Sequence, residues 1–379
     1  MLSTQLLNKL KEIRRTFHAN PEVGMHEFET QKRILSFLGS NSTATIQKMG
    51  ETGVLATFDS QIKGATIMIR GDIDALPIVE TNTFEHASVV NGVSHKCGHD
   101  GHTTILLGLA TLLSERPIIK GKVLLLFQPA EENGMGAEAV LNDLNFPSEA
   151  IDYVFALHNL PSYKLHEIVV KDNEFTANVK SIILKMTGKT AHAAEPEQGD
   201  NPSMAIAEIL AFADKITHNK PEEADFFLMT PIYATLGDLA YGISAGYGEV
   251  HFTIRSWNTD LMAKHADQIV DFMTQTCIKY KLTPEISWSQ VFHANLNTKE
   301  AVDFIRKAAR HNDYNLTERP YPFRWGEDFG LFTQKYKGAM FGIGAGENSP
   351  ALHNPDYDFP DEITETGIRM FYQIIHEIL

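Results

Sequence analysis

The hexapeptide Cys97–His102 (CGHDGH) combines a thiol, two imidazoles and a carboxylate where a helix is expected to begin. Thiolate sulfur and imidazole nitrogen are ligands that hold zinc-like ions at about 2.0–2.3 Å. The same residues also suit a helix N-terminus that is merely rich in histidine. The hexapeptide therefore indicates a metal site only if other parts of the chain supply further ligands.

Four other short clusters of oxygen or nitrogen ligands stand at the ends of apolar runs. They are Gly71–Pro77, Gln128–Glu132, Ala156–Asn159 and Leu352–Pro355. Each has an ordinary interpretation by itself: adjacent glutamates are common on solvated helices, a single histidine is usually not a ligand, and two aspartates after a strand can cap a turn. Their recurrence after apolar runs favours one shared site.

The elements that must position these clusters alternate between helix and strand. Apolar residues at helical spacing from Leu2 to Phe17 predict a first helix that ends at Asn20-Pro21. Further helices are expected over residues 103–113, 298–311 and 362–379. Continuous apolar strands separated by helices predict a largely buried α/β sheet. The expected strands are Gly53–Phe58, Ala65–Arg70, Lys122–Phe127, Tyr153–Leu157 and Ala339–Ile343.

The strand ends of such a sheet give the ligand clusters a common position. In open α/β sheets the ligand crevice lies beyond the carboxyl ends of the strands. The residues expected just past a strand end are Asp72, Asp74, Glu131, Glu132 and His158. The spacing therefore predicts that these side chains line one site.

A second domain is predicted as an insertion over residues 177–287, between two parts of a first domain at 1–176 and 288–379. Apolar and polar residues alternate along Glu249–Trp257, as in a sheet covered on one face only. The order βαββαβ predicts a ferredoxin-like α+β sandwich. Its expected elements are Val179–Met186, Asn201–Ile216, Phe226–Leu236, Glu249–Trp257, Asp260–Tyr280 and Pro284–Trp288.

Composition limits the classes of function. The 379 residues carry a formal net charge of −15, which disfavours binding to nucleic-acid phosphates. No segment is long and apolar enough to suggest membrane insertion, and the N-terminal residues do not resemble a secretory signal. The two cysteines, Cys97 and Cys277, are expected to be free thiols in a cytoplasmic protein.

These motifs together resemble the aminoacylase-like family of dinuclear-metal amidohydrolases and metallopeptidases, which includes hippurate hydrolase, indole-acetyl-amino-acid hydrolase and N-acetyl-diaminopimelate deacetylase. The resemblance runs from Arg14–Glu22 to Leu352–Phe359. It implies a metallopeptidase-like catalytic domain with a mixed, largely parallel sheet. It also implies that the inserted domain is a lid and dimerisation domain, so that a homodimer is expected.

The resemblance implies a role for each side chain of the clusters. The implied metal ligands are Cys97, His99, Glu132, His158 and His353, with Cys97 bridging two ions where related peptidases have an aspartate. The implied cofactors are two divalent metal ions per subunit. Zinc, manganese, cobalt and nickel all accept such mixed ligands, so the sequence does not choose among them.

Two more residues of the first domain have implied catalytic roles. Glu131 would be the general base, taking a proton from water and handing it to the leaving nitrogen. Asp74 would orient a metal ligand. His102 is expected to pack or hydrogen-bond near the site without binding metal.

In the inserted domain, Gly188–Pro196 resembles a family stretch whose histidine, here His192, stabilises the oxyanion, often across a dimer interface. Thr190-Ala191 replaces two glycines that are usual in the family, and Glu197 replaces a common second histidine. Arg255 matches a family arginine that would bind a substrate carboxylate through two parallel hydrogen bonds. Without the resemblance, an arginine there equally suits the solvated face of an open sheet.

The predicted activity is metal-dependent hydrolysis of the amide bond of N-acyl amino acids, for example N-acetyl amino acids, or of related small conjugates. The expected partner is therefore a small-molecule substrate. A dipeptidase or aminopeptidase of the same clan is the first alternative, and a catalytically dead binding protein is the second.

Overall fold

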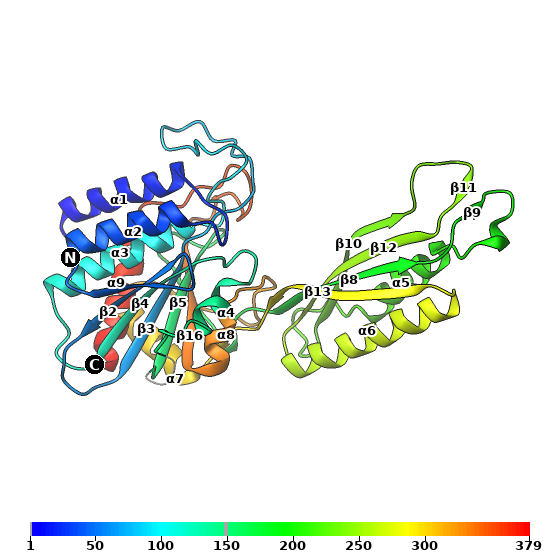
Figure 1. The fold of residues 1–379 in the computed structure, drawn as a ribbon. Helices are drawn as coiled ribbons and strands as arrows, with labels where there is room; N and C mark the ends of the chain where they lie inside the picture. Colours follow the sequence, from blue (N-terminus) through cyan, green and yellow to red (C-terminus); the bar gives the residue numbers. More distant parts are fainter. Residues whose placement is uncertain (1, 148–150) are drawn as a thin grey trace. The chain divides into compact units, whose positions relative to one another are not determined.

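The computed structural model describes residues 2–147 and 151–379, which form two compact units (Figure 1). The first unit contains the described residues of 1–175 together with 295–320 and 327–379. The second unit contains Thr176–Ala294 and the short segment Tyr321–Gly326. This segment joins the second unit through a β-bridge between Thr176 and Phe323.

The first unit is built on one eight-stranded sheet. Strands β4, β3, β5 and β16 form its parallel centre, and antiparallel pairs flank that centre. This arrangement confirms the predicted α/β class with a mixed, largely parallel sheet. In spatial order the strands are β1 (Thr45–Met49), β2 (Gly53–Asp59), β4 (Lys122–Gln128), β3 (Thr66–Asp72), β5 (Tyr153–Leu160), β16 (Lys337–Gly344), β6 (Ile168–Val170) and β15 (Leu316–Glu318).

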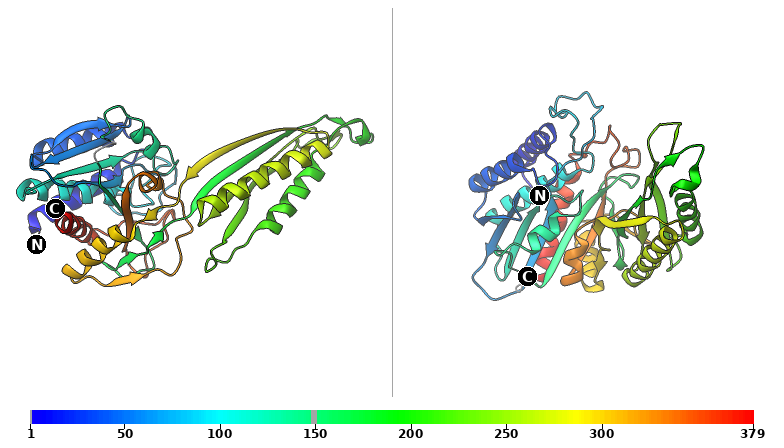
Figure 2. Two further views of the ribbon diagram at one scale, coloured as in Figure 1. Left: turned by 90° about the horizontal axis from the view of Figure 1, so that it is seen from below. Right: turned by 45° about the vertical axis from the view of Figure 1, so that its right-hand side comes forward.

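Helices cover this sheet because its central strands are apolar on both faces. Helix α3 is buried on nearly all sides, against β3 and among α1, α2 and α9 (Figures 1 and 2). Ser3 caps α1 by accepting a hydrogen bond from Leu6 N at 3.2 Å. The longer helices are α1 (Thr4–Ala19), α2 (Phe28–Asn41), α3 (His99–Glu115), α7 (Lys299–His311) and α9 (Ile363–Ile378); the short ones are α4 (Gly136–Leu141) and α8 (Gly330–Lys335).

Three boundaries differ from the sequence prediction in ways that matter for the site. Helix α3 begins at His99 because Gly98, at φ +94°, makes the left-handed turn before it. The expectation that His158 follows a strand is wrong, because β5 continues to Leu160 where its parallel partner β16 continues to Gly344. Asp72 is likewise the last residue of β3 rather than the first residue beyond it.

The second unit is an antiparallel four-stranded sheet with two helices on one face (Figures 1 and 2). The strands lie in the order β10, β12, β8, β13, as in the predicted βαββαβ sandwich. Val250, Phe252 and Ile254 of β12 are buried beneath the helices. The elements are β8 (Asn178–Thr187), α5 (Ser203–Ile216), β10 (Phe227–Leu236), β12 (Tyr247–Ser256), α6 (Thr259–Lys279) and β13 (Thr283–Phe292).

Two further expectations concern the membrane and the thiols. Within residues 2–147 and 151–379, every helix is too short or too polar to cross a membrane. Cys97 and Cys277 are both free and buried, as expected.

Candidate metal centre

Five side chains of the first unit form two groups of potential metal ligands that share Cys97. The first group is Cys97, His99 and His158; the second is Cys97, Glu132 and His353. Within each group the ligand atoms lie within 4.8 Å of one another. The Cys97 Sγ and His158 Nε2 atoms are 3.5 Å apart. The structure therefore brings together all five residues that the sequence analysis took as ligands.

The sheet explains why residues so distant in sequence meet here. Strands β3, β4 and β5 are parallel neighbours, so their carboxyl ends lie at the same edge. His158 lies near the end of β5, and Glu132 follows the turn after β4. His99 opens α3, and His353 lies in the segment between β16 and α9.

A strained turn presents the two glutamates after β4. Ala130 has φ +51°, which is unusual for a residue other than glycine. Its amide donates a 2.7 Å hydrogen bond to Oε1 of Glu27, a fully buried carboxyl that also accepts from Thr52 Oγ1 at 2.7 Å. These contacts fix the turn that carries Glu131 and Glu132.

Asp74 orients two of the candidate ligands. His99 Nδ1 lies 3.1 Å from both the Oδ1 atom and the carbonyl oxygen of Asp74. Both oxygens are acceptors, so Nδ1 carries a hydrogen, and Nε2 is the ring nitrogen that faces the cluster. The other carboxylate oxygen of Asp74 accepts a 3.0 Å hydrogen bond from the Glu132 amide. Asp74 thus holds one ligand by its ring and the other by its main chain.

Buried atoms without partners show that the cluster suits a cation. His99 Nε2 and Glu132 Oε1 are 3.8 Å apart, and neither has a hydrogen-bond partner among the described residues. Buried polar atoms normally have one. A set of sulfur, nitrogen and oxygen donors that face one another matches the ligands of zinc and similar ions.

The electrostatics of the cluster favour positive charge. Burial opposes protonation of His99, yet the nearby carboxylates of Asp72 and Asp74 raise its pKa to about 10. Burial and the charges of Glu132 and Glu131 raise the pKa of the Cys97 thiol. A metal cation at these atoms would relieve the same concentration of negative charge and lower the pKa of the thiol.

Glu131 lies beside these ligands and is almost completely buried. Burial and the charges of Glu327 and Glu132 raise its pKa well above the usual range for a carboxyl. A carboxylate whose pKa is raised accepts a proton more readily, which is what a general base requires.

A buried ion network around Arg70 is not indicated by any of the sequence motifs. Arg70 contacts carboxylate oxygens of Asp72 at 2.5 Å, Asp328 at 2.7 Å and Glu327 at 2.9 Å. It also donates to Gln128 Oε1 at 2.8 Å. The available signal was a single charged residue at the end of the otherwise apolar run 65–70. Its partners could not be identified from spacing, because Asp328 lies 258 positions away.

His102 is part of a second buried chain of hydrogen bonds. Its Nδ1 lies 2.6 Å from Asp72 Oδ1, and its Nε2 lies 2.6 Å from Asn159 Oδ1. Asn159 in turn donates to the carbonyl oxygen of Cys97 at 3.0 Å. Both ring nitrogens of His102 therefore lie at hydrogen-bonding distance from oxygen atoms, and His102 also belongs to a group of potential metal ligands with Asp72 and His99.

The two remaining candidate residues lie in the second unit. His192 belongs to the short strand β9 (Ala191–His192) and is exposed, with Nδ1 accepting a 3.0 Å hydrogen bond from Ala194 N. Arg255 of β12 is half-buried and donates to the carbonyl oxygen of Arg324 at 2.6 Å. Burial and the charge of Arg324 lower the pKa of Arg255.

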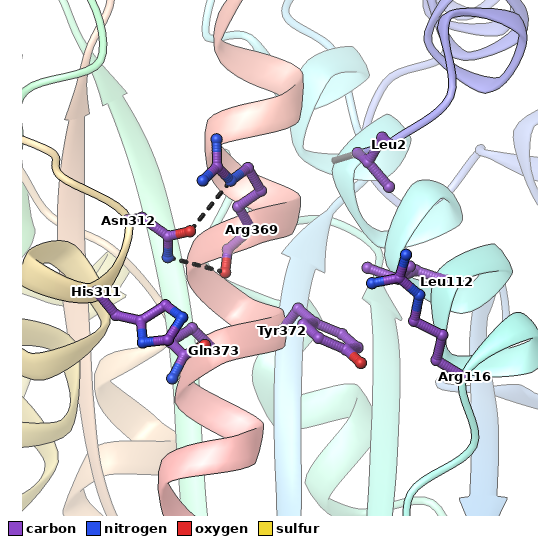
Figure 3. Close-up of a pocket in the computed structure, with 8 residues that line it drawn as sticks. All are labelled: Leu2, Leu112, Arg116, His311, Asn312, Arg369, Tyr372 and Gln373. Atoms are coloured by element: carbon purple, nitrogen blue, oxygen red, sulfur yellow. Dashed lines mark hydrogen bonds between the residues drawn. The ribbon is translucent and has the colours of Figure 1, made fainter.

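A separate hollow in the first unit lies among α3, α7 and α9 (Figure 3). It has a volume of about 200 Å³, and its lining includes Arg116, His311 and Arg369. Arg369 Nε donates to Asn312 Oδ1 at 3.1 Å. The lining shares no residue with the two ligand groups, so the hollow is not part of the metal centre.

Comparison with known proteins gives consistent results. Residues 68–377 match peptidase family M20/M25/M40. N-acetyldiaminopimelate deacetylases of Bacillus subtilis (strain 168) and Bacillus velezensis are 29% and 28% identical, covering 96% of this chain and 97% and 96% of their own lengths. A solved Bacillus subtilis structure, described as a dinuclear metal binding peptidase from the M20 family, aligns over all of both chains with a TM-score of 0.83 and 25% identity.

Proposed function

We propose that this chain, which belongs to peptidase family M20/M25/M40, is a metal-dependent amidohydrolase that cleaves the amide bond of N-acyl amino acids. The observation that carries the proposal is the pair of ligand groups joined through Cys97. The similarity to N-acetyldiaminopimelate deacetylases supports an acyl amide as the substrate. The similarity to a dinuclear metal binding peptidase supports two ions.

In this proposal Cys97, His99 and His158 would hold one divalent ion, and Cys97, Glu132 and His353 would hold a second. The donor atoms suit zinc, manganese, cobalt and nickel alike. When bound, two such ions activate a water molecule and polarise the scissile carbonyl.

The side chains then have distinct tasks. Glu131 takes a proton from the attacking water and delivers it to the leaving nitrogen. Asp74 keeps His99 in the tautomer whose Nε2 is free to bind metal. His192 donates to the oxygen that becomes negative as the carbonyl is attacked.

The second unit supplies the lid and the dimer interface in this proposal, and the protein is a cytoplasmic homodimer. Strand β10 is an edge strand, and its Ile232, Tyr233 and Leu236 side chains are exposed. Exposed apolar edge strands favour pairing with another chain. The free cysteines fit a reducing compartment.

A direct assay tests the proposed substrate class. The metal-loaded protein is given N-acetyl amino acids, including N-acetyl-diaminopimelate, and matched unblocked dipeptides. We expect release of acetate from the N-acetyl substrates and little cleavage of the dipeptides. Faster dipeptide cleavage would instead favour a dipeptidase or aminopeptidase, an alternative that the peptidase family supports. Metal binding without hydrolysis of either class would indicate a binding protein.

The thiol of Cys97 should be protected by metal. A coordinating thiolate is deprotonated and occupied, so iodoacetamide should label Cys97 slowly in the loaded protein and faster after chelation. Restoring metal should restore protection. Cys277, fully buried in α6, is the internal control, because its labelling would report unfolding instead. Equal labelling of Cys97 with and without metal would contradict its role as a ligand.

Arg255→Lys should raise KM for an N-acetyl amino acid by about 10–100-fold, because losing a charge-assisted hydrogen bond costs about 1.5–3 kcal/mol. Conversion of the substrate carboxylate to an amide should remove most of this penalty. An equal penalty on both substrates would mean that Arg255 acts mainly through its bond to the Arg324 carbonyl.

A further inference from the structure

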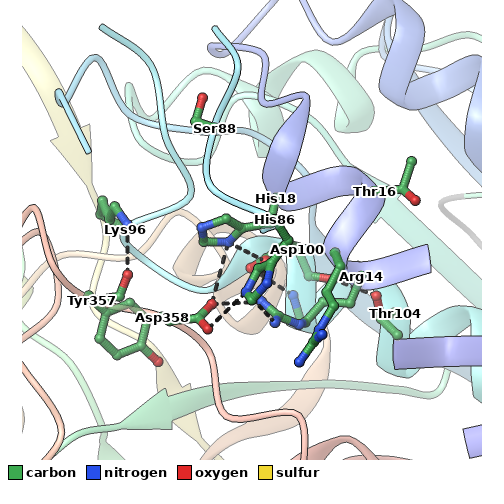
Figure 4. Close-up of polar contacts among 12 residues, drawn as sticks. Arg14, Thr16, His18, His86, Ser88, Lys96, Asp100, Thr104, Tyr357 and Asp358 are labelled. Carbon is green, nitrogen blue, oxygen red and sulfur yellow. Dashed lines mark hydrogen bonds and ion pairs between the residues drawn. The ribbon is translucent and has the colours of Figure 1, made fainter. Parts of the chain in front are cut away.

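An ionic cluster that includes Arg14, His18, Asp100 and Asp358 has no part in the proposed chemistry (Figure 4). Arg14 and His18 of α1 both contact Asp100, the second residue of α3, at 3.0 and 2.9 Å. Arg14 also contacts Asp358 at 2.8 Å. Cations and carboxylates alternate through the cluster, which joins α1, the start of α3 and the segment before α9.

Lys96 connects this cluster to two ligand-bearing segments. It immediately precedes Cys97, and its side chain is completely buried. Its ammonium binds the Glu80 carboxylate. It also donates to the Tyr357 carbonyl oxygen at 2.8 Å (Figure 4). Its own carbonyl oxygen accepts a 2.8 Å hydrogen bond from His353 N. Lys96 is thus joined at two points to the segment that carries His353.

The partner of Lys96 is itself held firmly. Glu80 accepts from His18 Nε2 at 3.1 Å and from Ser88 N at 2.6 Å. Both ring nitrogens of His18 face carboxylate oxygens, so the ring carries two hydrogens and a positive charge. Burial opposes that charge, but the hydrogen bonds to Asp100 and Glu80 raise the pKa of His18 to about 9. Lys96 therefore docks against a fixed carboxylate.

The five candidate ligands differ in how they are fixed. His99 is held by Asp74, and His158 Nδ1 lies 2.9 Å from the Asn159 carbonyl oxygen. His353 stands apart: its side chain is 52% exposed and its φ is +67°. The hydrogen bond from its amide to Lys96 ties this exposed turn to the segment that carries Cys97.

We propose that Lys96 is a positioning residue that holds His353 in place to bind the second ion. The inference rests on the proposed function, because it uses the ligand set given there. Removing the ammonium would break the link between Glu80 and the Tyr357 carbonyl oxygen. Thr81 N would still donate to the Pro355 carbonyl oxygen, and the contacts that hold His99 and His158 would remain. The second metal position should therefore weaken selectively.

The test is a zinc titration of the metal-free Lys96→Met protein against a chromophoric chelator. One of the two affinities should fall by about 10–100-fold, as is usual when a group that orients a ligand is removed. The other affinity should stay unchanged. The zinc affinity that falls in Lys96→Met should be the one that falls in His353→Ala. It should not be the one that falls in His158→Ala.

A matched control and a second variant keep the result interpretable. Arg306→Met is the control, because it also removes ion pairs within the first unit, those with Glu318 and Asp303. None of these three residues is next to a candidate ligand in the sequence. Both zinc affinities of this variant should be unchanged. Lys96→Met leaves the Glu80 charge short of a partner. The double variant Glu80→Gln/Lys96→Met removes that charge, and it should show the same selective loss.

Two outcomes would overturn the inference in a folded variant. Unchanged zinc affinities would show that His353 does not need Lys96. An equal fall in both affinities, with a lower melting temperature of the metal-free protein, would show a general structural role. A wild-type protein that binds fewer than two zinc ions would contradict the proposed function itself. This result concerns the wild-type protein, so it differs from the two outcomes for the variant.

Discussion

Glu131→Gln should lower kcat by about 10²–10⁴-fold, because glutamine cannot take a proton from water or deliver one to the leaving nitrogen. Glutamine has nearly the same shape, and the hydrogen bond that fixes the preceding turn runs from the Ala130 amide to the Glu27 carboxylate, so it does not involve Glu131. The protein should therefore keep its fold and both metal ions. The measurement is steady-state hydrolysis of an N-acetyl amino acid, with metal content determined on the same sample.

The neighbouring carboxylate provides the matched control. Glu132→Gln should lose metal as well as activity, since Glu132 Oε1 is one of the buried atoms that face the ligand cluster. The two variants thus separate proton transfer from metal binding at adjacent positions. Near-normal turnover by a fully metal-loaded Glu131→Gln protein would rule out Glu131 as the base.

His192→Ala should be the second variant with a large effect. A donor aimed at a developing oxyanion typically contributes about 10²–10³ in kcat. His192 lies in the second unit, exposed on the short strand β9, so its removal should leave the metal content unchanged. Steady-state kinetics together with metal analysis checks both expectations.

Mixing two inactive variants tests whether His192 acts on the partner subunit. His192→Ala and Glu131→Ala are combined under conditions that exchange subunits. If His192 acts in trans, one site of each mixed dimer has an intact Glu131 and an intact His192, and activity returns. If it acts within its own chain, every site still lacks one group. No recovery after verified subunit exchange would exclude the trans arrangement.

The sequence predicted best those features that depend on local patterns. Apolar runs located the central strands, and short motifs contain the five candidate ligands. The sequence placed His158 just beyond the end of a strand, but it lies inside β5. The length of β5 depends on its pairing with β16, which comes nearly two hundred residues later. Local periodicity does not contain that information.

The supporting contacts of the site were not predictable for the same reason. Arg70, Lys96 and His18 resemble ordinary charged residues in the sequence, and only the fold brings them to Asp328, Tyr357 and Asp100. Once these three side chains are buried, each needs an oppositely charged or hydrogen-bonding partner, because a charge removed from water is costly without one. Such partners are set by long-range packing, so they appear only once the sheet and its helices are assembled.

If two metal ions at the Cys97 cluster drive amide hydrolysis, titrating the metal-free protein with a divalent ion should restore its activity. Acetate release from an N-acetyl amino acid and bound metal are measured at each step. We predict no activity after complete chelation, and recovery that reaches its maximum when two ions are bound per chain. Full activity in protein shown by elemental analysis to contain no metal would contradict the account.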